Sequence, residues 1–205
     1  MIWLMDDSVS ALTEAFRRFD EIHAEDPKRI PRDGMEVPWS LHYHRRMTHW
    51  LDRLEPEASD ALRLAARCQH VRRWTVPRTE YPEGKLGYKK WRSDLAVFHG
   101  EQAEEVLRGC GFDETVIQRV KDLLQKKGLK TDPETQTFED VICLVFLENE
   151  FAEFSAKHSE EKMHTILRKT WAKMSERGRK EALALAKELP PEAVGVLHRA
   201  LGGGQ

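Results

Sequence analysis

The residues best suited to chemistry in this sequence are basic and aromatic side chains around one irregular stretch. Between Arg63 and Arg92 there are nine basic residues and two acidic ones, a net charge of +7. Arginine forks bind phosphate through paired charge-assisted hydrogen bonds, and aromatic rings stack on nucleotide bases. The pattern therefore favours a phosphorylated small molecule, such as a nucleotide, as the ligand. The candidate binding residues are Arg73, Trp74, Arg78, Tyr81, Tyr88, Trp91, Arg92 and, further along the chain, Lys127.

A structural role is the alternative for this basic cluster. Residues 101–160 contain seven basic and fourteen acidic residues, a net charge of −7. The basic side chains could therefore form a solvated helix face that pairs with the acidic half of the chain.

Two histidines stand out by their position. His99 follows Leu95 by four residues and precedes Ala103 by four, which places it on the apolar face of its helix. His70 lies at the end of a helix that leads into the irregular stretch. The alternative for both is a core histidine with satisfied hydrogen bonds. The other histidines, His23 and His44 among them, are predicted to be surface or packing residues.

The adjacent carboxylates Glu139 and Asp140 open the most apolar helix, predicted over 138–154. They are either exposed at the helix N-terminus, where the helix dipole favours them, or buried and in need of a cation. If His70, His99 and Asp140 converge, they suit a divalent transition metal such as Mn, Fe or Zn, whose bound water could act in hydrolysis. Without a metal, His70 and Glu139 could act as general base and acid.

The elements that position these residues are predicted to be helical almost throughout. Apolar residues recur at spacings of three and four, beginning behind Ser8 as a possible helix cap. A loop is expected from Asp26 to Gly34, and a longer one from Thr75 to Gly87, where two prolines and two glycines forbid a continuous helix. The prediction is one all-α domain over 1–205, a bundle of about eight helices with its core at about 8–188 and a flexible tail at 201–205.

Composition excludes several classes of protein. The 205 residues carry a formal charge of −2, which argues against a dedicated nucleic-acid or membrane-surface binder. The three cysteines, Cys68, Cys110 and Cys143, form no CxxC pair, so neither a disulfide framework nor a thiolate zinc site is expected. No membrane span and no signal peptide are expected, which predicts a cytoplasmic protein. The oligomeric state is left open.

Several motifs together resemble one protein family, the domain of unknown function 4202. The similarity covers nearly the whole chain, and the family has no known activity to transfer. The residues that carry it are Arg46–Leu51, Ala58–Asp60, Ala65–His70, Arg73–Trp74, Pro77–Arg78, Tyr81–Pro82, Gly87–Tyr88, Trp91–Arg92, His99, Leu123–Leu124, Lys127, Asp132–Gln136, Glu139–Leu147 and Lys169–Ser175.

The order of these motifs also resembles, more distantly, the HD-type metal-dependent phosphohydrolases. That all-α superfamily binds metal through a first His, an adjacent His-Asp pair and a late Asp. By this resemblance His70 matches the first His, and Asp140 or Glu139 matches the late Asp. The sequence has no His-Asp pair, although Asp94 lies in the corresponding region. Either His99 substitutes as a ligand, or the metal centre is lost.

Three functions follow as hypotheses. The first is an HD-like hydrolase of a phosphorylated small molecule, with metal at His70, His99 and Asp140. The second is a non-catalytic phosphate-binding module with the same arginine and aromatic residues. The third is a metal-free enzyme that uses His70 and Glu139 in acid–base chemistry.

Overall fold

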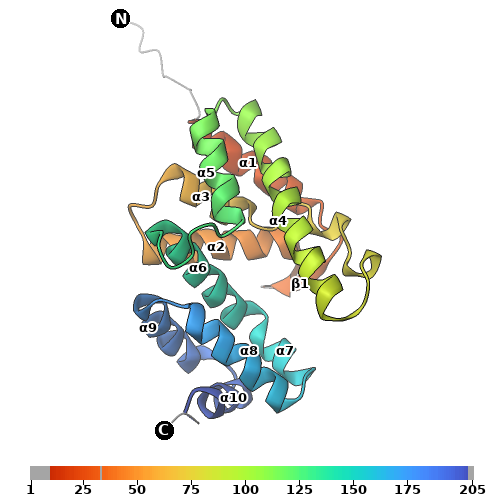
Figure 1. Ribbon diagram of the computed structural model, residues 1–205, viewed down its shortest axis with the longest axis vertical. Helices are drawn as coiled ribbons and strands as arrows, with labels where there is room; N and C mark the ends of the chain where they lie inside the picture. The colour runs from red at the N-terminus through yellow and green to blue at the C-terminus, as the bar shows by residue number, and fades with distance from the viewer. Residues whose placement is uncertain (1–9, 33, 203–205) are drawn as a thin grey trace, which may run out of the picture. The chain divides into compact units, whose positions relative to one another are not determined.

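The computed structural model describes residues 10–32 and 34–202 (Figure 1). These residues form ten α-helices, three short 3-10 helices and one two-stranded sheet, so the all-α prediction is confirmed and the helices outnumber the eight expected. The predicted cap Ser8 and the tail residues 203–205 lie outside the described residues; Ser10 caps the first helix, and the last helix extends to Gly202. In chain order the elements are α1 (Ala11–Ala24), β1 (Arg29–Arg32), β2 (Met35–Pro38), α2 (Trp39–Leu54), α3 (Asp60–Cys68), η1 (Arg73–Thr75), η2 (Arg78–Glu80), α4 (Gly84–Gly109), α5 (Glu114–Leu124), α6 (Pro133–Asn149), α7 (Phe151–Ala156), α8 (Glu160–Lys173), α9 (Glu176–Leu185), η3 (Ala186–Glu188) and α10 (Pro191–Gly202).

The chain divides into two compact units. Unit 1 comprises residues 1–44 and 59–125, and unit 2 comprises residues 45–58 and 126–205. The chain passes between the units within α2 and again near residues 58 and 125. No linker composition marks these crossings, which is why the sequence predicts a single domain.

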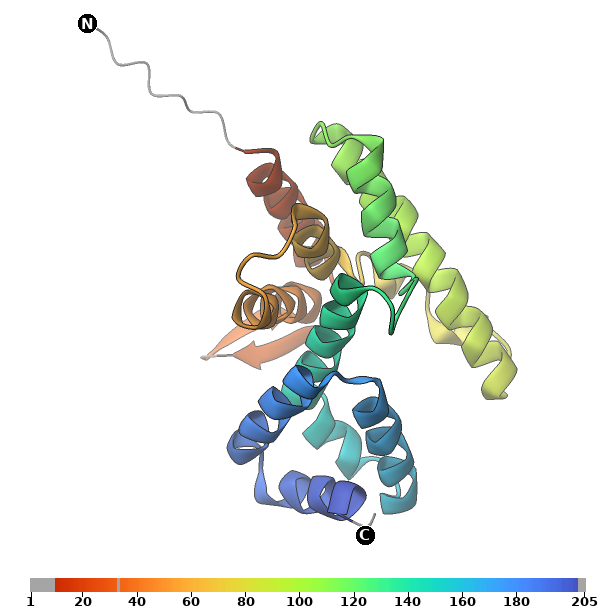
Figure 2. The ribbon, with the colours of Figure 1, turned by 60° about the vertical axis from the view of Figure 1, so that its left-hand side comes forward.

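Unit 1 is a helical layer built on α4 and α5. These two helices lie side by side, and α3 packs on α5 while α1 packs on both α3 and α4 (Figures 1 and 2). Gly100 of α4 lets the helices approach, since a Cβ there would lie 3.3 Å from the Lys121 side chain. The core consists of fully buried apolar side chains from all four helices, among them Phe19, Leu62, Leu64, Leu107, Ile117 and Leu123.

A β-hairpin occupies the place where the sequence predicts a loop. The strands β1 and β2 pair antiparallel, with Ile30 opposite Val37. The Asp26 carboxylate joins the two ends of this segment, because it accepts hydrogen bonds from the backbone N–H of Lys28 (2.8 Å) and of Ser40 (3.0 Å). Each strand has only four residues, mostly exposed, so the alternation that signals a strand is missing from the sequence.

Unit 2 is organised by the apolar helix α6. Asp132 caps this helix through the backbone N–H of Glu134, and Pro133 occupies its first turn, where no N–H partner is needed. Its buried side chains include Phe138, Val141, Leu144 and Val145, in accordance with the predicted central helix. Helix α9 packs on α6, and α10 packs on α8 and α7 (Figure 2). Among the described residues, no helix has the length and apolar character to span a membrane.

Candidate functional site

Four histidines gather inside unit 1, and they come from four different parts of its fold. His23 lies on α1, His44 on α2, His70 just after α3, and His99 on α4. The rings of His23 and His44 stack with centroids 3.8 Å apart, those of His44 and His70 are 6.2 Å apart, and those of His70 and His99 are 5.7 Å apart. We call these four residues the histidine cluster.

The first two members of the histidine cluster have complete hydrogen bonds. His23 Nε2 donates to the Arg67 carbonyl at 2.9 Å, so its Nδ1 is the acceptor for the Ser40 hydroxyl, also at 2.9 Å. His44 Nδ1 donates to the Ser40 carbonyl at 2.7 Å, so its Nε2 accepts the backbone N–H of His70 at 3.0 Å. His23, Ser40 and His44 thus form a buried support that positions the backbone at His70.

The other two members each have one ring nitrogen without a partner. His99 Nδ1 donates to the Val71 carbonyl at 2.9 Å, which leaves the lone pair on Nε2. The Arg73 guanidinium donates to His70 Nε2 at 2.9 Å, which leaves the proton on Nδ1. Both His99 Nε2 and His70 Nδ1 are buried, and neither has a hydrogen-bond partner among the described residues. The site therefore presents one imidazole acceptor and one imidazole donor to a ligand or a water molecule.

Arg73 and Arg92 add positive charge beside these nitrogens. The Arg73 guanidinium lies 4.8 Å from the centre of the Trp91 ring. This contact and the hydrogen bond to His70 hold the guanidinium in place. Arg92 lies on the exposed side of α4, close enough to act electrostatically on both His70 and His99. Among the described residues, no hydrogen bond or ion pair engages Arg92.

A strained turn brings Arg73 back toward His70. Arg72 adopts the left-handed conformation (φ 52°, ψ 25°), which costs a non-glycine residue about 1 kcal/mol. Its guanidinium is held by Gln102 on α4 at 2.9 Å. The reversed chain places Arg73 three residues after His70 in hydrogen-bond contact with the same ring.

All four imidazoles are neutral near pH 7. Burial lowers the pKa of His99 to about 3 and the pKa of His23 to about 4. Burial also holds the pKa values of His44 and His70 well below 6.5, and the Arg73 charge lowers the pKa of His70 further. The His70 residue as a whole is half-buried, but its Nδ1 is inaccessible to solvent. Because the rings are neutral, the lone pair of His99 Nε2 is available at physiological pH.

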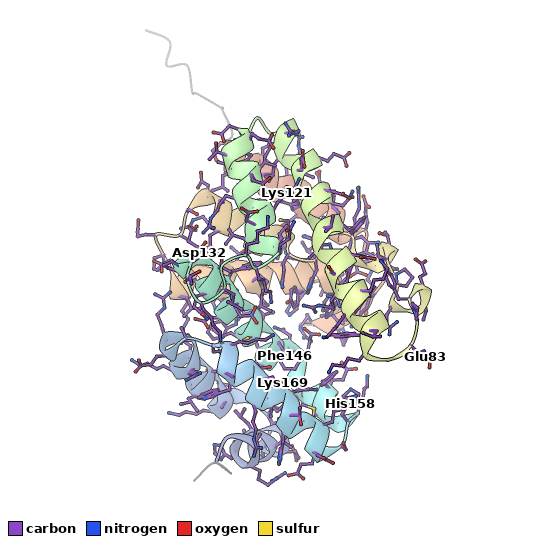
Figure 3. All side chains as sticks on the ribbon, in the orientation of Figure 1. Glu83, Lys121, Asp132, Phe146, His158 and Lys169 are labelled. Atoms are coloured by element: carbon purple, nitrogen blue, oxygen red, sulfur yellow. The ribbon has the colours of Figure 1, made fainter. Side chains whose placement is uncertain are left out.

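The irregular stretch after η1 is anchored to the start of α4. Arg78 donates to the carbonyls of Tyr81 (2.8 Å), Pro82 (2.8 Å) and Gly84 (3.4 Å), so its guanidinium already binds the loop itself. Trp91 Nε1 donates to the Val76 carbonyl at 3.0 Å. A Cβ at Gly87 would lie 1.8 Å from the Pro82 carbonyl oxygen, so only glycine fits there. Figure 3 shows Glu83 where this loop enters α4.

The remaining predicted binding residues belong to η1, the loop, α4 and unit 2. Tyr88 is 49% exposed, and its ring lies 5.9 Å from that of Trp91. Tyr81 lies on the loop with the Lys90 ammonium 6.0 Å from its ring centre, and Trp74 belongs to η1. Lys127 belongs to unit 2, where its carbonyl accepts the Thr135 hydroxyl at 2.9 Å.

The two carboxylates Glu139 and Asp140 belong to unit 2 and are buried there with partners. Asp140 accepts the backbone N–H of Ser175 at 2.8 Å and the Ser175 hydroxyl, at the N-terminus of α9, where the helix dipole favours a negative charge. Glu139 is 2% exposed and pairs with Lys126 and, at 3.4 Å, with Lys173. A buried carboxylate is expected to need a cation, and for Glu139 the two lysines provide it.

The hydrogen bonds of the histidines indicate which ring nitrogens could bind a metal ion. Metal-binding histidines usually donate their second N–H to a carbonyl, as His99 does to Val71. In the described part of the chain, no group of three or more His, Cys, Asp or Glu residues is arranged to hold a metal ion. His99 Nε2 is the donor best prepared for a ligand, followed by His70 after release of Arg73.

Sequence patterns indicate His70 and His99 as candidate site residues, but they do not indicate the buried residues whose hydrogen bonds position His70. Ser40 and His44 are one helical turn apart on α2, and that spacing was the available signal. His23 gave no signal, because its pairing with Ser40 joins residues 17 positions apart.

A comparison with family models gives one match for this chain. The model described as Domain of unknown function (DUF4202) matches residues 13–196. The chain belongs to this family. No curated protein and no solved structure matches the chain. The resemblance to HD-type phosphohydrolases has no counterpart in these comparisons and stays a prediction.

Proposed function

We propose that unit 1 binds a phosphorylated small molecule beside His70 and His99 and hydrolyses the bond that joins the phosphate group to the rest of the molecule. The observation that carries this proposal is a pair of buried nitrogens that have no hydrogen-bond partner among the described residues, with Arg73 in contact with His70 and Arg92 within electrostatic range of both rings. A buried polar atom without a partner costs about 1–3 kcal/mol, so a ligand or an ordered water molecule that completes these two hydrogen bonds would be favoured.

In this proposal the two arginines bind the phosphate group. Arg92 has no competing partner among the described residues, and Arg73 is held in position by Trp91. Phosphoryl transfer depends mainly on positioning and on stabilisation of negative charge, which two guanidinium groups provide.

The histidines position the attacking water. A water molecule between the rings can donate to His99 Nε2 and accept from His70 Nδ1–H. As its oxygen attacks phosphorus, the P–O bond to the leaving group breaks and the water proton passes to His99. The low pKa of His99 makes it a weak base in the free protein, but a bound phosphate dianion raises the pKa of a neighbouring imidazole by attraction.

The test combines binding and hydrolysis. Orthophosphate binding is measured by calorimetry, and phosphate release is measured from p-nitrophenyl phosphate and a panel of nucleotides. Arg92→Gln is expected to weaken orthophosphate binding about tenfold, the value of one charged hydrogen bond. His99→Gln is expected to lower the hydrolysis rate by about 100-fold or more, since it removes the proton acceptor.

His49→Gln serves as the matched control, because His49 is an exposed histidine of unit 2. It should leave both binding and hydrolysis unchanged. Absence of orthophosphate binding in the wild-type protein would overturn the proposal. Binding without hydrolysis would leave the second hypothesis, a non-catalytic phosphate-binding module.

The metal-dependent version of this activity is a second candidate, and the orientation of His99 favours it. With Nδ1 fixed on the Val71 carbonyl, Nε2 points its lone pair away as a metal ligand would. Metal content measured by mass spectrometry on protein purified without a His-tag tests it. About one ion of Mn, Fe or Zn per chain that is lost in His99→Gln supports this version. Full activity in metal-free protein rejects it.

A further inference from the structure

The exposed face of α4 carries a line of basic residues that leads to the histidine cluster. Lys85, Arg92 and His99 are seven residues apart, so each lies on nearly the same side of the helix as the last. At a rise of about 1.5 Å per residue, Lys85 and Arg92 are about 10 Å apart along the helix axis. Lys89 lies between them on the same face, four residues after Lys85.

Exposure changes along this line from solvent to interior. Lys85, Lys89 and Arg92 are exposed, Ala96 is half-buried, and His99 is only 4% exposed. The anchored loop covers a different side of α4, because its contacts are with Gly87 and Trp91. The basic side chains from Lys85 to Arg92 are therefore exposed, and the same side of the helix becomes buried one to two turns later, at Ala96 and His99.

Contacts among the described residues do not explain why positions 85 and 89 carry lysine. Neither Lys85 nor Lys89 forms a hydrogen bond or ion pair within the described part of the chain. Lys85 lies in the first turn of α4, where the helix dipole disfavours positive charge and no acidic residue is present. The pair also repels at a spacing of four residues. Positions that break local rules without compensation in the fold are expected where a ligand is bound.

We infer that the substrate carries a chain of two or more phosphate groups that lies along α4. The terminal phosphate binds at Arg92 and Arg73 beside the buried Nε2 of His99, and the preceding phosphates bind Lys89 and Lys85. This inference rests on the proposed function, because it takes the reacting phosphate to be the one at His99. It restricts the substrate class to compounds such as nucleoside di- and triphosphates or inorganic polyphosphates.

Inorganic probes test the inference without a guess at the rest of the substrate. Calorimetry in buffer free of divalent cations compares orthophosphate, pyrophosphate and tripolyphosphate. The wild-type protein should bind tripolyphosphate at least about tenfold more tightly than orthophosphate. The double variant Lys85→Gln/Lys89→Gln should lose that advantage and keep its affinity for orthophosphate.

Lys90→Gln is the matched control for charge. It removes one positive charge from the same helix, as each substitution of the double variant does, but Lys90 is on another face and pairs with Asp94 at 2.8 Å. The preference for tripolyphosphate should survive in this variant. Equal loss in Lys90→Gln and the double variant would show a non-specific charge effect and overturn the inference.

Two further outcomes separate the inference from the proposed function. Orthophosphate binding that depends on Arg92, with no gain for tripolyphosphate, would leave the proposed function and reject the phosphate chain. Tripolyphosphate binding that depends on the lysines but is unchanged in Arg92→Gln would show that the lysines bind tripolyphosphate away from the histidine cluster. That result would reject the inference. If no probe binds, both proposals fail.

Discussion

The histidine cluster of unit 1 and the carboxylate pair of unit 2 are both buried, but their hydrogen bonds differ. In unit 2, Asp140 binds Ser175 through both of its oxygens and Glu139 pairs with two lysines. In unit 1, His99 Nε2 and His70 Nδ1 have no partner within the described residues. Sequence patterns single out His70, His99 and the two carboxylates as candidate catalytic or metal-binding residues, but not His23 and His44. The contacts of the two carboxylates have a structural explanation within unit 2, whereas the proposed function has a ligand or a water molecule complete the hydrogen bonds of His99 Nε2 and His70 Nδ1.

The largest expected difference between the two regions is in how much stability each loses at acidic pH. The folded-state pKa values of the histidine cluster are lowered below 6.5, so the folded protein keeps these rings neutral while the unfolded chain binds protons below pH 6.5. Their contribution to stability is complete above pH 6.5 and is lost as pH falls toward the folded-state pKa values, which are about 4 for His23 and about 3 for His99. At pH 5 the loss is about 2 kcal/mol for each histidine that stays neutral in the fold.

Hydrogen exchange at pH 7 and pH 5 measures this effect in each unit. After correction for the intrinsic exchange rate, amides of α3 and α4 in unit 1 should lose protection at pH 5. Amides of α6 and α9 should keep theirs. Equal loss in both units would show that the cluster is not the acid-sensitive part of the molecule.

The second effect concerns the completed contacts of Asp140. A Cβ at Gly178 would lie 2.5 Å from Asp140 Cγ, so Gly178→Ala must displace the buried carboxylate from Ser175. We expect a loss of about 3 kcal/mol in the free energy of unfolding, from overpacking and lost hydrogen bonds. Urea denaturation measures it. Gly202→Ala is the control, since its Cβ would meet nothing within 4 Å, and an equal cost in both variants would contradict the assignment.

The smallest expected effect is a difference in stability between variants of Arg78 and Arg92, two of the three arginines predicted to bind phosphate. Because Arg78 binds three carbonyls of its own loop, Arg78→Ala should lower the free energy of unfolding by about 1 kcal/mol. Arg92→Gln should change it by less than about 0.5 kcal/mol, as for an exposed side chain without partners. Thermal denaturation of both variants measures the difference. The reverse order would assign the structural role to Arg92.

Helical periodicity predicted most of the fold because each helix here buries one apolar face. The hairpin at Arg29–Pro38 escaped prediction, since its pairing depends on Asp26 rather than on apolar alternation. No change in composition accompanies the division into two compact units within α2, so the sequence carries no signal for it.

The candidate site was predicted in part for a similar reason. Spacing places His99 on the inner face of α4 and His70 at the end of α3, which are local properties of a helix. The hydrogen bonds that set each tautomer join distant segments, such as Val71 to His99 and His44 to His70. The partners of Asp140 and Glu139 are likewise set by tertiary contacts, so spacing alone could not tell a ligand-binding carboxylate from a paired one.

The most direct test of the central claim is nitrogen NMR of the histidine rings during titration with orthophosphate. In the free protein His99 should be the Nδ1–H tautomer and neutral at pH 7. Orthophosphate should shift the His99 Nε2 and His70 Nδ1 resonances while His49 stays unchanged, and in Arg92→Gln the same shifts should require about tenfold more orthophosphate. Resonances of His70 and His99 that do not respond at saturating orthophosphate would contradict the account.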